Sequence, residues 1–206
     1  MAIRTAVNRA LTAITALPTA AALTDGNLTL LTTATASSSA TLDFTSSINS
    51  TYNSYLFKFI NIHAATNTAL LNFQTDTGTN TSYNQAVTST SFRANQNEAD
   101  GGAALSYRGG GDQAQGTAFE KLSQAVSNDN DSGISGFLQL FNPSSTTFVK
   151  HFIGTSNTAQ ATPESQATYY AGYFNTTTAL TRVRFKMSSG NMDSGTIKMY
   201  GVGPKQ

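Results

Sequence analysis

Short segments in which apolar and polar residues alternate fill most of the chain from about residue 42 to its end. A period of two is typical of β-strands with one buried face, because successive side chains point to opposite sides of a sheet. The clearest such segment is 182–187, where three apolar residues alternate with three basic ones. Clusters of Gly, Asn, Asp and Ser separate the segments, as expected of turns. This pattern predicts an all-β protein.

We expect about nine or ten strands, with no helical periodicity between them. The irregular segment 95–116 is predicted to be a long loop with a short strand at 104–107, and the ambiguous segment 117–126 is assigned to a strand on its context. So many short strands in about 160 residues close most simply as a β-sandwich or jelly roll. The other predicted strands lie at 55–62, which looks buried on both sides, around Leu71 and Phe73, at 88–94, around Leu138 and Leu140, and at 148–153, 168–174, 182–187 and 196–202.

The first forty residues have a different character. Apolar residues recur there at helical spacing and Pro18 follows them, which predicts a short amphipathic helix. A helix of this length is marginal alone in water, so its apolar side is a candidate anchoring face. A Thr, Ser and Ala run at 32–41 indicates an extended connector. We therefore expect a helix and anchoring arm at 1–40 and a β-sandwich module at 41–206. The candidate anchoring face consists of Ile3, Val7, Leu11 and Ile14.

Composition narrows the possible partners. Charged residues make up 11% of the chain and the formal net charge is +1, whereas an ordinary soluble protein has about 25% charged residues. No global electric field therefore attracts nucleic acid or anionic lipid. No apolar run approaches the roughly 18 residues of a membrane span. Without cysteine there is no disulfide framework and no thiolate nucleophile.

The two histidines, His63 and His151, are the first candidates for chemistry. His151 is predicted to share a strand face with Val149 and Ile153, while Lys150 lies on the other face with Phe148 and Phe152. Catalysis by histidine needs a nucleophile or carboxylate in reach, and no Gly-x-Ser-x-Gly elbow is present. The histidines also lack the close spacing of a zinc site. We expect His151 to be a structural strand residue.

Three further features of the sequence resemble metal, phosphate or catalytic sites, but each is incomplete. The segment 127–133, SNDNDSG, has oxygen ligands spaced as in a calcium loop, but the position of the bidentate acid is Gln139. The glycine-rich segment 108–116 lacks the Gly-Lys-Ser/Thr ending of a phosphate loop. Five acidic residues could supply the carboxylate pair of a glycosidase, but the sequence places no two of them together. We therefore expect no catalytic residue, metal or cofactor. The calcium-type ligands are Asn128, Asn130 and Ser132, followed by Gly133, and the acids are Glu98, Asp100, Asp112, Glu120 and Glu164.

One basic patch is expected. Arg182, Arg184 and Lys186 line one face of a strand, and Lys198 is expected across the hairpin from them. This candidate partner-contact face could meet phosphate, an acidic glycan or an acidic protein. The simpler interpretation is a solvated outer face, because nucleic-acid binding on a sheet usually adds stacking aromatic residues.

Three stretches of the sequence carry a resemblance. They read ATLDFTSSINSTYNSYLFKFINIHAATNTALLNFQTD, GFLQLFNPSSTTFVKHF and YYAGYFNTTTALTRVRFKMSSGNMDSGTIKMYGV. Together they resemble a β-rich module of virion proteins from tailed bacteriophages, notably those of marine bacteria and cyanobacteria. The likeness covers roughly residues 40–202. It consists of sequence patterns of strands and turns and includes no catalytic motif, so it implies no catalytic residue in this chain.

The resemblance implies a location on the particle surface. Because no repeat shaft or coiled coil precedes the module, we expect a non-enzymatic capsid decoration or cement protein that contacts the major capsid protein or tail proteins. The alternative is a tail or head fibre protein whose loops 95–116 and 127–136 bind a host surface glycan, and a depolymerase is a third hypothesis. Symmetric homo-oligomers are expected, with a trimer as the first candidate.

Overall fold

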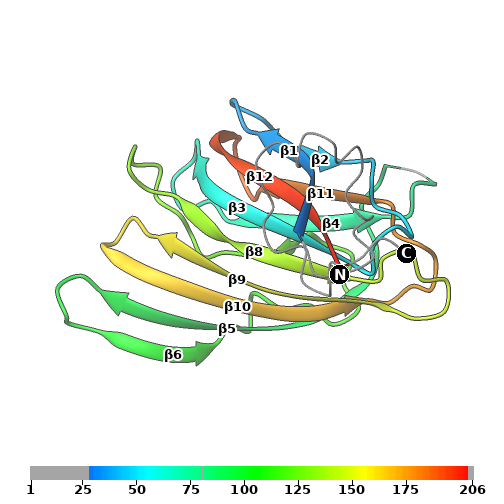
Figure 1. Ribbon diagram of the computed structural model, residues 1–206. Helices are drawn as coiled ribbons and strands as arrows, with labels where there is room; N and C mark the ends of the chain where they lie inside the picture. Colours follow the sequence, from blue (N-terminus) through cyan, green and yellow to red (C-terminus); the bar gives the residue numbers. More distant parts are fainter. Residues whose placement is uncertain (1–27, 80, 204–206) are drawn as a thin grey trace, which may run out of the picture.

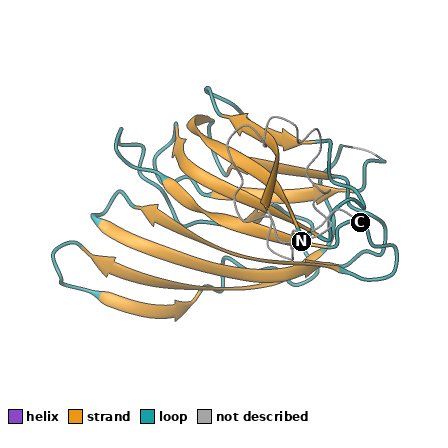
Figure 2. Ribbon diagram, viewed as in Figure 1, coloured by secondary structure: helices purple, strands orange, loops and turns teal. Residues whose placement is uncertain are grey.

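The structure, a computed structural model, describes residues 28–79 and 81–203 of the 206-residue chain. The expected helix with Ile3, Val7, Leu11 and Ile14 lies outside these ranges. Within them every regular element is a strand, and Figure 2 shows the strands joined by loops and turns. None of the described residues forms a helix long and apolar enough to cross a membrane. The strands are β1 (Leu28–Thr35), β2 (Leu42–Phe44), β3 (Ser54–Ala64), β4 (Leu71–Asp76), β5 (Val87–Asn97), β6 (Ala103–Tyr107), β7 (Glu120–Lys121), β8 (Ile134–Phe141), β9 (Lys150–Ala159), β10 (Glu164–Phe174), β11 (Arg182–Met187) and β12 (Met192–Val202).

The strands form two antiparallel sheets. The larger has eight strands in the order β1-β12-β3-β8-β9-β10-β5-β6, and the smaller has four in the order β2-β11-β4-β7. Figure 1 shows the long strands β8, β9, β10 and β5 running side by side, with β6 at one edge. The prediction of an all-β chain is confirmed, and the two sheets are those of a β-sandwich.

Aromatic side chains from both sheets build the core. Phe73 on β4 lies 5.2 Å from Phe152 on β9 and 5.7 Å from Phe174 on β10, measured between ring centroids. Phe185 on β11 lies 5.4 Å from Phe59 on β3. All five rings are almost completely buried. Each comes from an alternating segment, so the period of two seen in the sequence selects the side chains that meet between the sheets.

Beyond this aromatic core the inner face of the large sheet becomes polar. Polar side chains on β5, β9 and β10 that point the same way as the core are buried, and the Ser156 hydroxyl donates a 2.5 Å hydrogen bond to the Leu122 carbonyl. Several of their polar atoms have no hydrogen-bond partner among the described residues. We call this region the polar half of the interior. Its residues are Ser91, Ser156, Thr158, Gln166 and Thr168.

Two predicted strands differ in their details. The segment 55–62 is buried on one side only, because Lys58 is exposed and Ile60 is 41% exposed on the other. Within 117–126 only Glu120 and Lys121 form a strand, and the remainder is irregular. The short strand predicted at 104–107 is confirmed by β6.

The large sheet also begins earlier than the expected module boundary. β1 pairs with β12 through residues 28–35, so part of the expected connector at 32–41 is a sheet strand. Thr residues that suggested an extended linker are equally suited to a pleated edge strand. The extended conformation was predicted, but its pairing was not.

Candidate functional site

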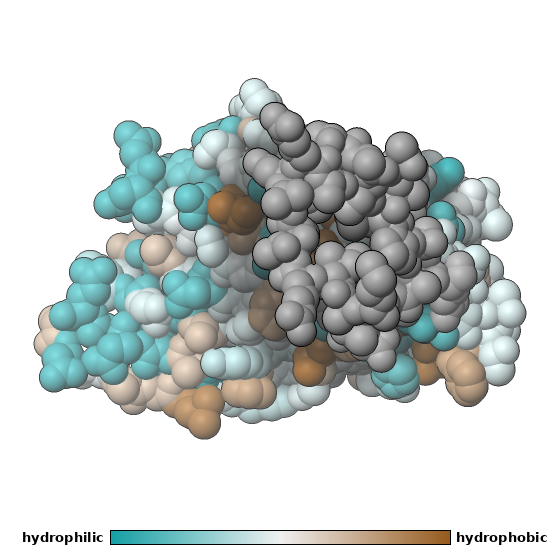
Figure 3. Space-filling view, in the orientation of Figure 1, coloured by the Kyte–Doolittle hydropathy of each residue, from teal (hydrophilic) through white to brown (hydrophobic). Residues whose placement is uncertain are grey.

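The eight-stranded sheet has an outer face that is turned away from the four-stranded sheet. Because side chains alternate, Phe152, Tyr170 and Ser91 point inward while their neighbours Ile153, Tyr169 and Phe92 point outward. Monomeric proteins rarely expose contiguous apolar patches of this kind, which usually mark binding sites. In the view of Figure 1, hydrophobic atoms appear at the lower edge of the molecule near the position of β6 (Figure 3). On the part of this face formed by β8, β9, β10, β5 and β6, the large hydrophobic side chains between 37% and 73% exposed are Phe92, Leu105, Tyr107, Phe137, Phe141, Ile153 and Tyr169.

Strand register arranges the outward side chains in rows across the sheet. The middle row, which includes Ala171, has smaller side chains in its centre than the rows on either side. The first row contains His151, Tyr173 and Thr88, the middle row Gln139, Ile153, Ala171 and Thr90, and the third row Phe137, Thr155, Tyr169, Phe92 and Tyr107.

The middle row is the floor of two adjoining depressions. One has a volume of about 500 Å³ and lies toward the first row, and the other has about 210 Å³ and lies toward the third. Ile153, Ala171 and Thr90 line both. We call the two together the aromatic groove. Its walls are Phe141, His151 and Tyr173 on one side and Phe92 and Tyr169 on the other.

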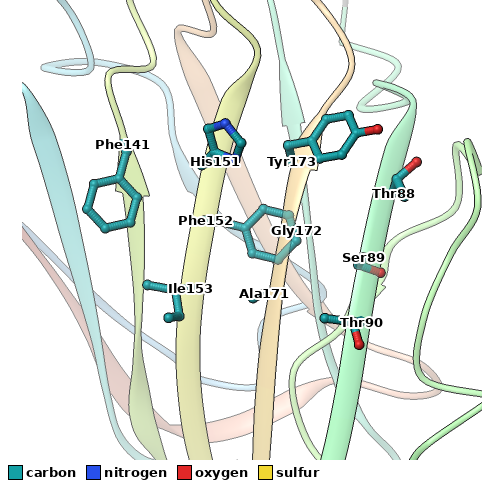
Figure 4. A pocket seen from close by; sticks show the side chains of 10 residues that line it. All are labelled: Thr88, Ser89, Thr90, Phe141, His151, Phe152, Ile153, Ala171, Gly172 and Tyr173. Atoms are coloured by element: carbon teal, nitrogen blue, oxygen red, sulfur yellow. The ribbon is translucent and has the colours of Figure 1, made fainter.

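The groove exists because Ala171 is small and lies between two tyrosines on β10. Figure 4 shows its position between Ile153 on β9 and Thr90 on β5, with the rings of His151 and Tyr173 next to each other above it. Beneath the floor, the ring of Tyr170 packs where a side chain at Gly154 would be. The Tyr170 hydroxyl donates a 2.8 Å hydrogen bond to the Phe137 carbonyl, which fixes the ring.

Both walls have defined ring geometry. The rings of His151 and Tyr173 are 5.9 Å apart at an angle of 56°, and those of Phe92 and Tyr169 are stacked 4.8 Å apart at 11°. Thr88 accepts hydrogen bonds from the backbone and side-chain nitrogens of Gln115 at 3.2 and 2.6 Å. None of the described residues that line the groove is Asp, Glu, Lys or Arg.

His151 was expected to be a structural strand residue, and it is an exposed wall of the groove on the same face as Ile153. Lys150 points the other way with Phe152, as predicted, whereas Phe148 is 68% exposed and precedes the strand. The buried Lys150 ammonium donates hydrogen bonds to the carbonyls of Phe148 and Thr176 at 2.9 and 3.0 Å. Burial lowers the pKa of Lys150.

The predicted basic face is divided between the two sheets. β11 pairs with β2 and β4, whereas Lys198 lies on β12 opposite Lys58 in the large sheet. The expectation that Lys198 lies across a hairpin from Arg182, Arg184 and Lys186 is therefore wrong. The turn between β11 and β12 carries the chain from one sheet to the other.

On β11 the cations have partners within the chain. Arg184 makes a two-point ion pair with Asp43, with N–O distances of 2.7 and 2.6 Å, and its guanidinium lies 4.1 Å from the centre of the Tyr83 ring. The hydrogen bonds to Asp43 raise the pKa of Arg184. The Lys186 ammonium lies 4.4 Å from the centre of the Phe119 ring. These contacts favour a structural role for the strand.

The calcium-like segment forms a polar turn beside His63. The Ser127 hydroxyl donates a 2.7 Å hydrogen bond to the Asp129 carboxylate, and the Nε2 atom of His63 lies 3.0 Å from the Asp129 carbonyl oxygen. Gln139, at the missing ligand position, lies on β8 and donates to the Ser54 hydroxyl at 3.0 Å. Among the described residues there is no group of three His, Cys, Asp or Glu side chains that could hold a metal.

Of the five candidate acids, Glu120 has the most unusual surroundings. It is completely buried and accepts hydrogen bonds from the Ser89 hydroxyl and the Gln113 amide at 2.9 and 3.1 Å. Burial raises the pKa of Glu120 to about 7, and burial lowers the pKa of the nearby Arg108 to about 10. Asp112 instead accepts a 2.5 Å hydrogen bond from the Tyr107 hydroxyl.

The other three acids lie nearer the surface, and Glu98 and Asp100 are exposed. Glu164, at the start of β10, accepts a hydrogen bond from the side chain of Gln166 at 2.8 Å. From the sequence, Glu120 was only one of five candidate acids. Its burial arises because β7 packs beneath β5, which the local sequence pattern does not show.

Comparison with known proteins adds no relative, because no protein-family model, no curated protein and no solved structure matches the chain.

Proposed function

We propose that this chain is a non-enzymatic structural protein on the surface of a tailed-phage particle, most simply a capsid decoration or cement protein. Two features support the proposal. The sequence resembles virion surface modules, and the large sheet ends in a strand whose outer edge is unpaired in the part of the chain that the structure describes, which suits contact with another chain.

The form of the sandwich is compatible with this role, and we propose a jelly roll as its core. With β5, β6, β9 and β10 set aside, the remaining strands are ordered β1-β12-β3-β8 in one sheet and β2-β11-β4-β7 in the other. Successive strands of these eight then lie in opposite sheets, except β4 and β7, which pair within the smaller sheet. This is the alternation of a double Greek key, an architecture common among viral capsid and lectin domains.

The unpaired edge of strand β6 is the observation that best supports a role in assembly. Among the described residues β6 pairs only with β5, so the backbone groups on its other side are available. Its side chains include Leu105, 73% exposed, and Tyr107, 61% exposed. Proteins usually protect such an edge with Pro, charge or a covering segment, and Ala103–Tyr107 has neither Pro nor charge. A neighbouring chain that adds a strand here would bury both side chains.

Substitution of Leu105 by Lys tests this edge, because a charge there opposes strand pairing. The variant should incorporate poorly into particles and shift toward monomer in light scattering. Phe148→Lys, at an exposed loop residue, is the matched control and should behave as the unaltered chain. Equal incorporation of all three proteins, with the same mass in solution, would contradict the proposal.

The expected N-terminal anchor is tested separately by a deletion of residues 1–27, which leaves β1 intact. Loss of particle association with an unchanged thermal midpoint would support an anchor that includes Ile3, Val7, Leu11 and Ile14. Undiminished association would remove the anchor from the proposal.

The second candidate is a tail or head fibre protein that binds a receptor glycan, and the aromatic groove favours it. A low-resolution density map of the intact particle separates the two candidates, because it places the protein on the shell or on the tail.

A further inference from the structure

We propose that the aromatic groove binds a neutral oligosaccharide. This site is distinct from the loops 95–116 and 127–136, and the proposal holds for a decoration protein or a fibre. It is carried by the shape of the groove, by the side chains of its walls and by its lack of charge.

The groove lies mainly on strands added to the eight that form the proposed jelly-roll core. Its floor and walls come from the hairpin β9–β10 and from β5, with Phe141 at the end of β8. These added strands extend the large sheet on one side, as Figure 1 shows. Because the core residues of the sandwich point inward, the outer face of the extension can carry a binding site without loss of the aromatic core.

The shape suits a chain of small rings. Depressions of about 500 and 210 Å³ adjoin through a common floor, and the larger lies within the usual range for small-ligand sites, roughly 300–1,000 Å³. Both depressions are open to solvent along one side, as the partial exposure of Ile153 and Tyr169 indicates. A ligand with two consecutive rings could therefore lie across Ala171 and extend beyond either end.

The walls have the two chemistries that a sugar requires. The faces of aromatic rings carry negative charge density and attract the polarised C–H bonds of a pyranose face. Hydroxyl groups on a sugar edge need hydrogen-bond partners when they leave water. Among the described residues, the ring nitrogens of His151 and the hydroxyl of Tyr173 have no hydrogen-bond partner, so both side chains can pair with a ligand. Thr88 lies beside Tyr173 in the same row.

The charge pattern selects a neutral ligand. No formal charge lines the groove, so an acidic or basic polymer would lose hydration there without gaining an ion pair. The cations of the same face, Lys58 and Lys198, follow Phe137 at the far end of the third row. They are separated from the groove by β8, which leaves its centre uncharged.

The test uses the purified full chain and linear hexasaccharides of glucose, mannose, galactose and N-acetylglucosamine, with a heparin hexasaccharide as the charged comparison. Binding is followed by titration calorimetry and by tyrosine fluorescence, which suits a chain with eight Tyr and no Trp. We expect at least one neutral sugar to bind with little dependence on salt, since no ion pair forms.

Two variants locate the binding. Tyr173→Ala removes one wall and should weaken binding roughly tenfold, the scale of one lost aromatic contact. Ala171→Phe fills the floor and should abolish binding. Phe148→Ala removes an exposed aromatic ring outside the groove and should leave affinity unchanged. Thermal midpoints confirm that each variant is folded, and Tyr173→Ala alone decides the matter if Ala171→Phe fails to fold.

Four results would overturn the proposal. The first is that no neutral sugar binds, and the second is that binding survives Tyr173→Ala and Ala171→Phe. The third is a salt-sensitive preference for heparin that disappears when Lys58 and Lys198 are replaced. A dimer of the unaltered chain that Tyr173→Ala dissociates would instead assign the groove to contact between copies.

Discussion

Lys58 on β3 and Lys198 on β12 lie directly opposite each other on neighbouring antiparallel strands. Both point to the outer face of the large sheet, and the Lys58 ammonium lies 5.6 Å from the centre of the Tyr200 ring. Like charges at opposed positions destabilise a sheet. Lys198 was predicted to belong to the basic face of β11. It instead repels Lys58 in the eight-stranded sheet.

Reversal of one charge in this pair should stabilise the protein. Lys198→Glu replaces a repulsive pair with an attractive one, for an expected gain of about 0.2–1 kcal/mol in unfolding free energy at low salt. The gain should shrink in 1 M NaCl because salt screens exposed charges. The double variant Lys58→Glu/Lys198→Glu restores a like-charge pair and serves as the control in urea denaturation. Equal stability of the single and double variants would show that the two residues do not interact.

Glu120 should make stability depend on pH. Burial raises its pKa from the ordinary 4.5 to about 7, so between these values the folded protein keeps a proton that the unfolded chain has lost. The unfolding free energy therefore falls as pH rises through this window, by on the order of 3 kcal/mol in total. Glu120→Gln, which cannot ionise, should flatten the curve.

The exposed Glu98 supplies the control for this experiment. Glu98→Gln removes the same charge from the surface and should preserve the fall in stability between pH 4.5 and 7. The measurement is denaturant unfolding at several pH values. A Glu120→Gln curve as steep as that of the unaltered chain would mean that another group titrates.

Gly154 should not tolerate a side chain. A Cβ atom there would lie 2.3 Å from the Phe137 carbonyl oxygen and 2.5 Å from the ring of Tyr170. Gly154→Ala should therefore cost about 1–3 kcal/mol of stability, as overpacked cores do. Gly110→Ala is the control, since nothing lies within 4 Å of its Cβ. Thermal unfolding compares the two, and similar midpoints would contradict the close packing under the groove floor.

The ion pair of Arg184 with Asp43 should show measurable coupling. Its two hydrogen bonds are short, but both side chains remain about one quarter exposed, so solvent limits the coupling to about 0.5–1 kcal/mol. A double-mutant cycle with Arg184→Met and Asp43→Asn measures it. In Arg184→Lys the single ammonium cannot reproduce the two-point contact, so most of the coupling should be lost. A coupling energy near zero would leave Arg184 as a packing residue over Tyr83.

Local pattern was sufficient to predict which residues face the core. Val183, Phe185 and Met187 are buried as their alternation predicted, and the opposite directions of Lys150 and His151 followed from the same rule. Alternation also holds in β3, but the prediction that its second side is buried is wrong at Lys58 and Ile60. An apolar or long side chain on the outer face looks the same in sequence as one buried by a second layer.

The pairing of the strands could not be predicted from the sequence. A tight turn between β11 and β12 suggested a hairpin, yet the two strands join different sheets. The choice depends on contacts with β3 and β4, more than a hundred residues away, which alternation does not record. The aromatic groove was missed for the same reason. His151 and Ile153 were placed on one face, but Tyr173 and Thr88 reach them only through the pairing of β9, β10 and β5.

The polar half of the interior also determines where the fold opens first. Under the four-stranded sheet, rings such as Phe73 and Phe152 hold the layers together, whereas the hydroxyls of Thr158 and Thr168 are buried without a hydrogen-bond partner among the described residues. Amide protons at the far ends of β9 and β10 should therefore exchange with deuterium through local opening, and those beside the aromatic core only through global unfolding. The protein would then open locally at one end of its long strands while the other end stays folded.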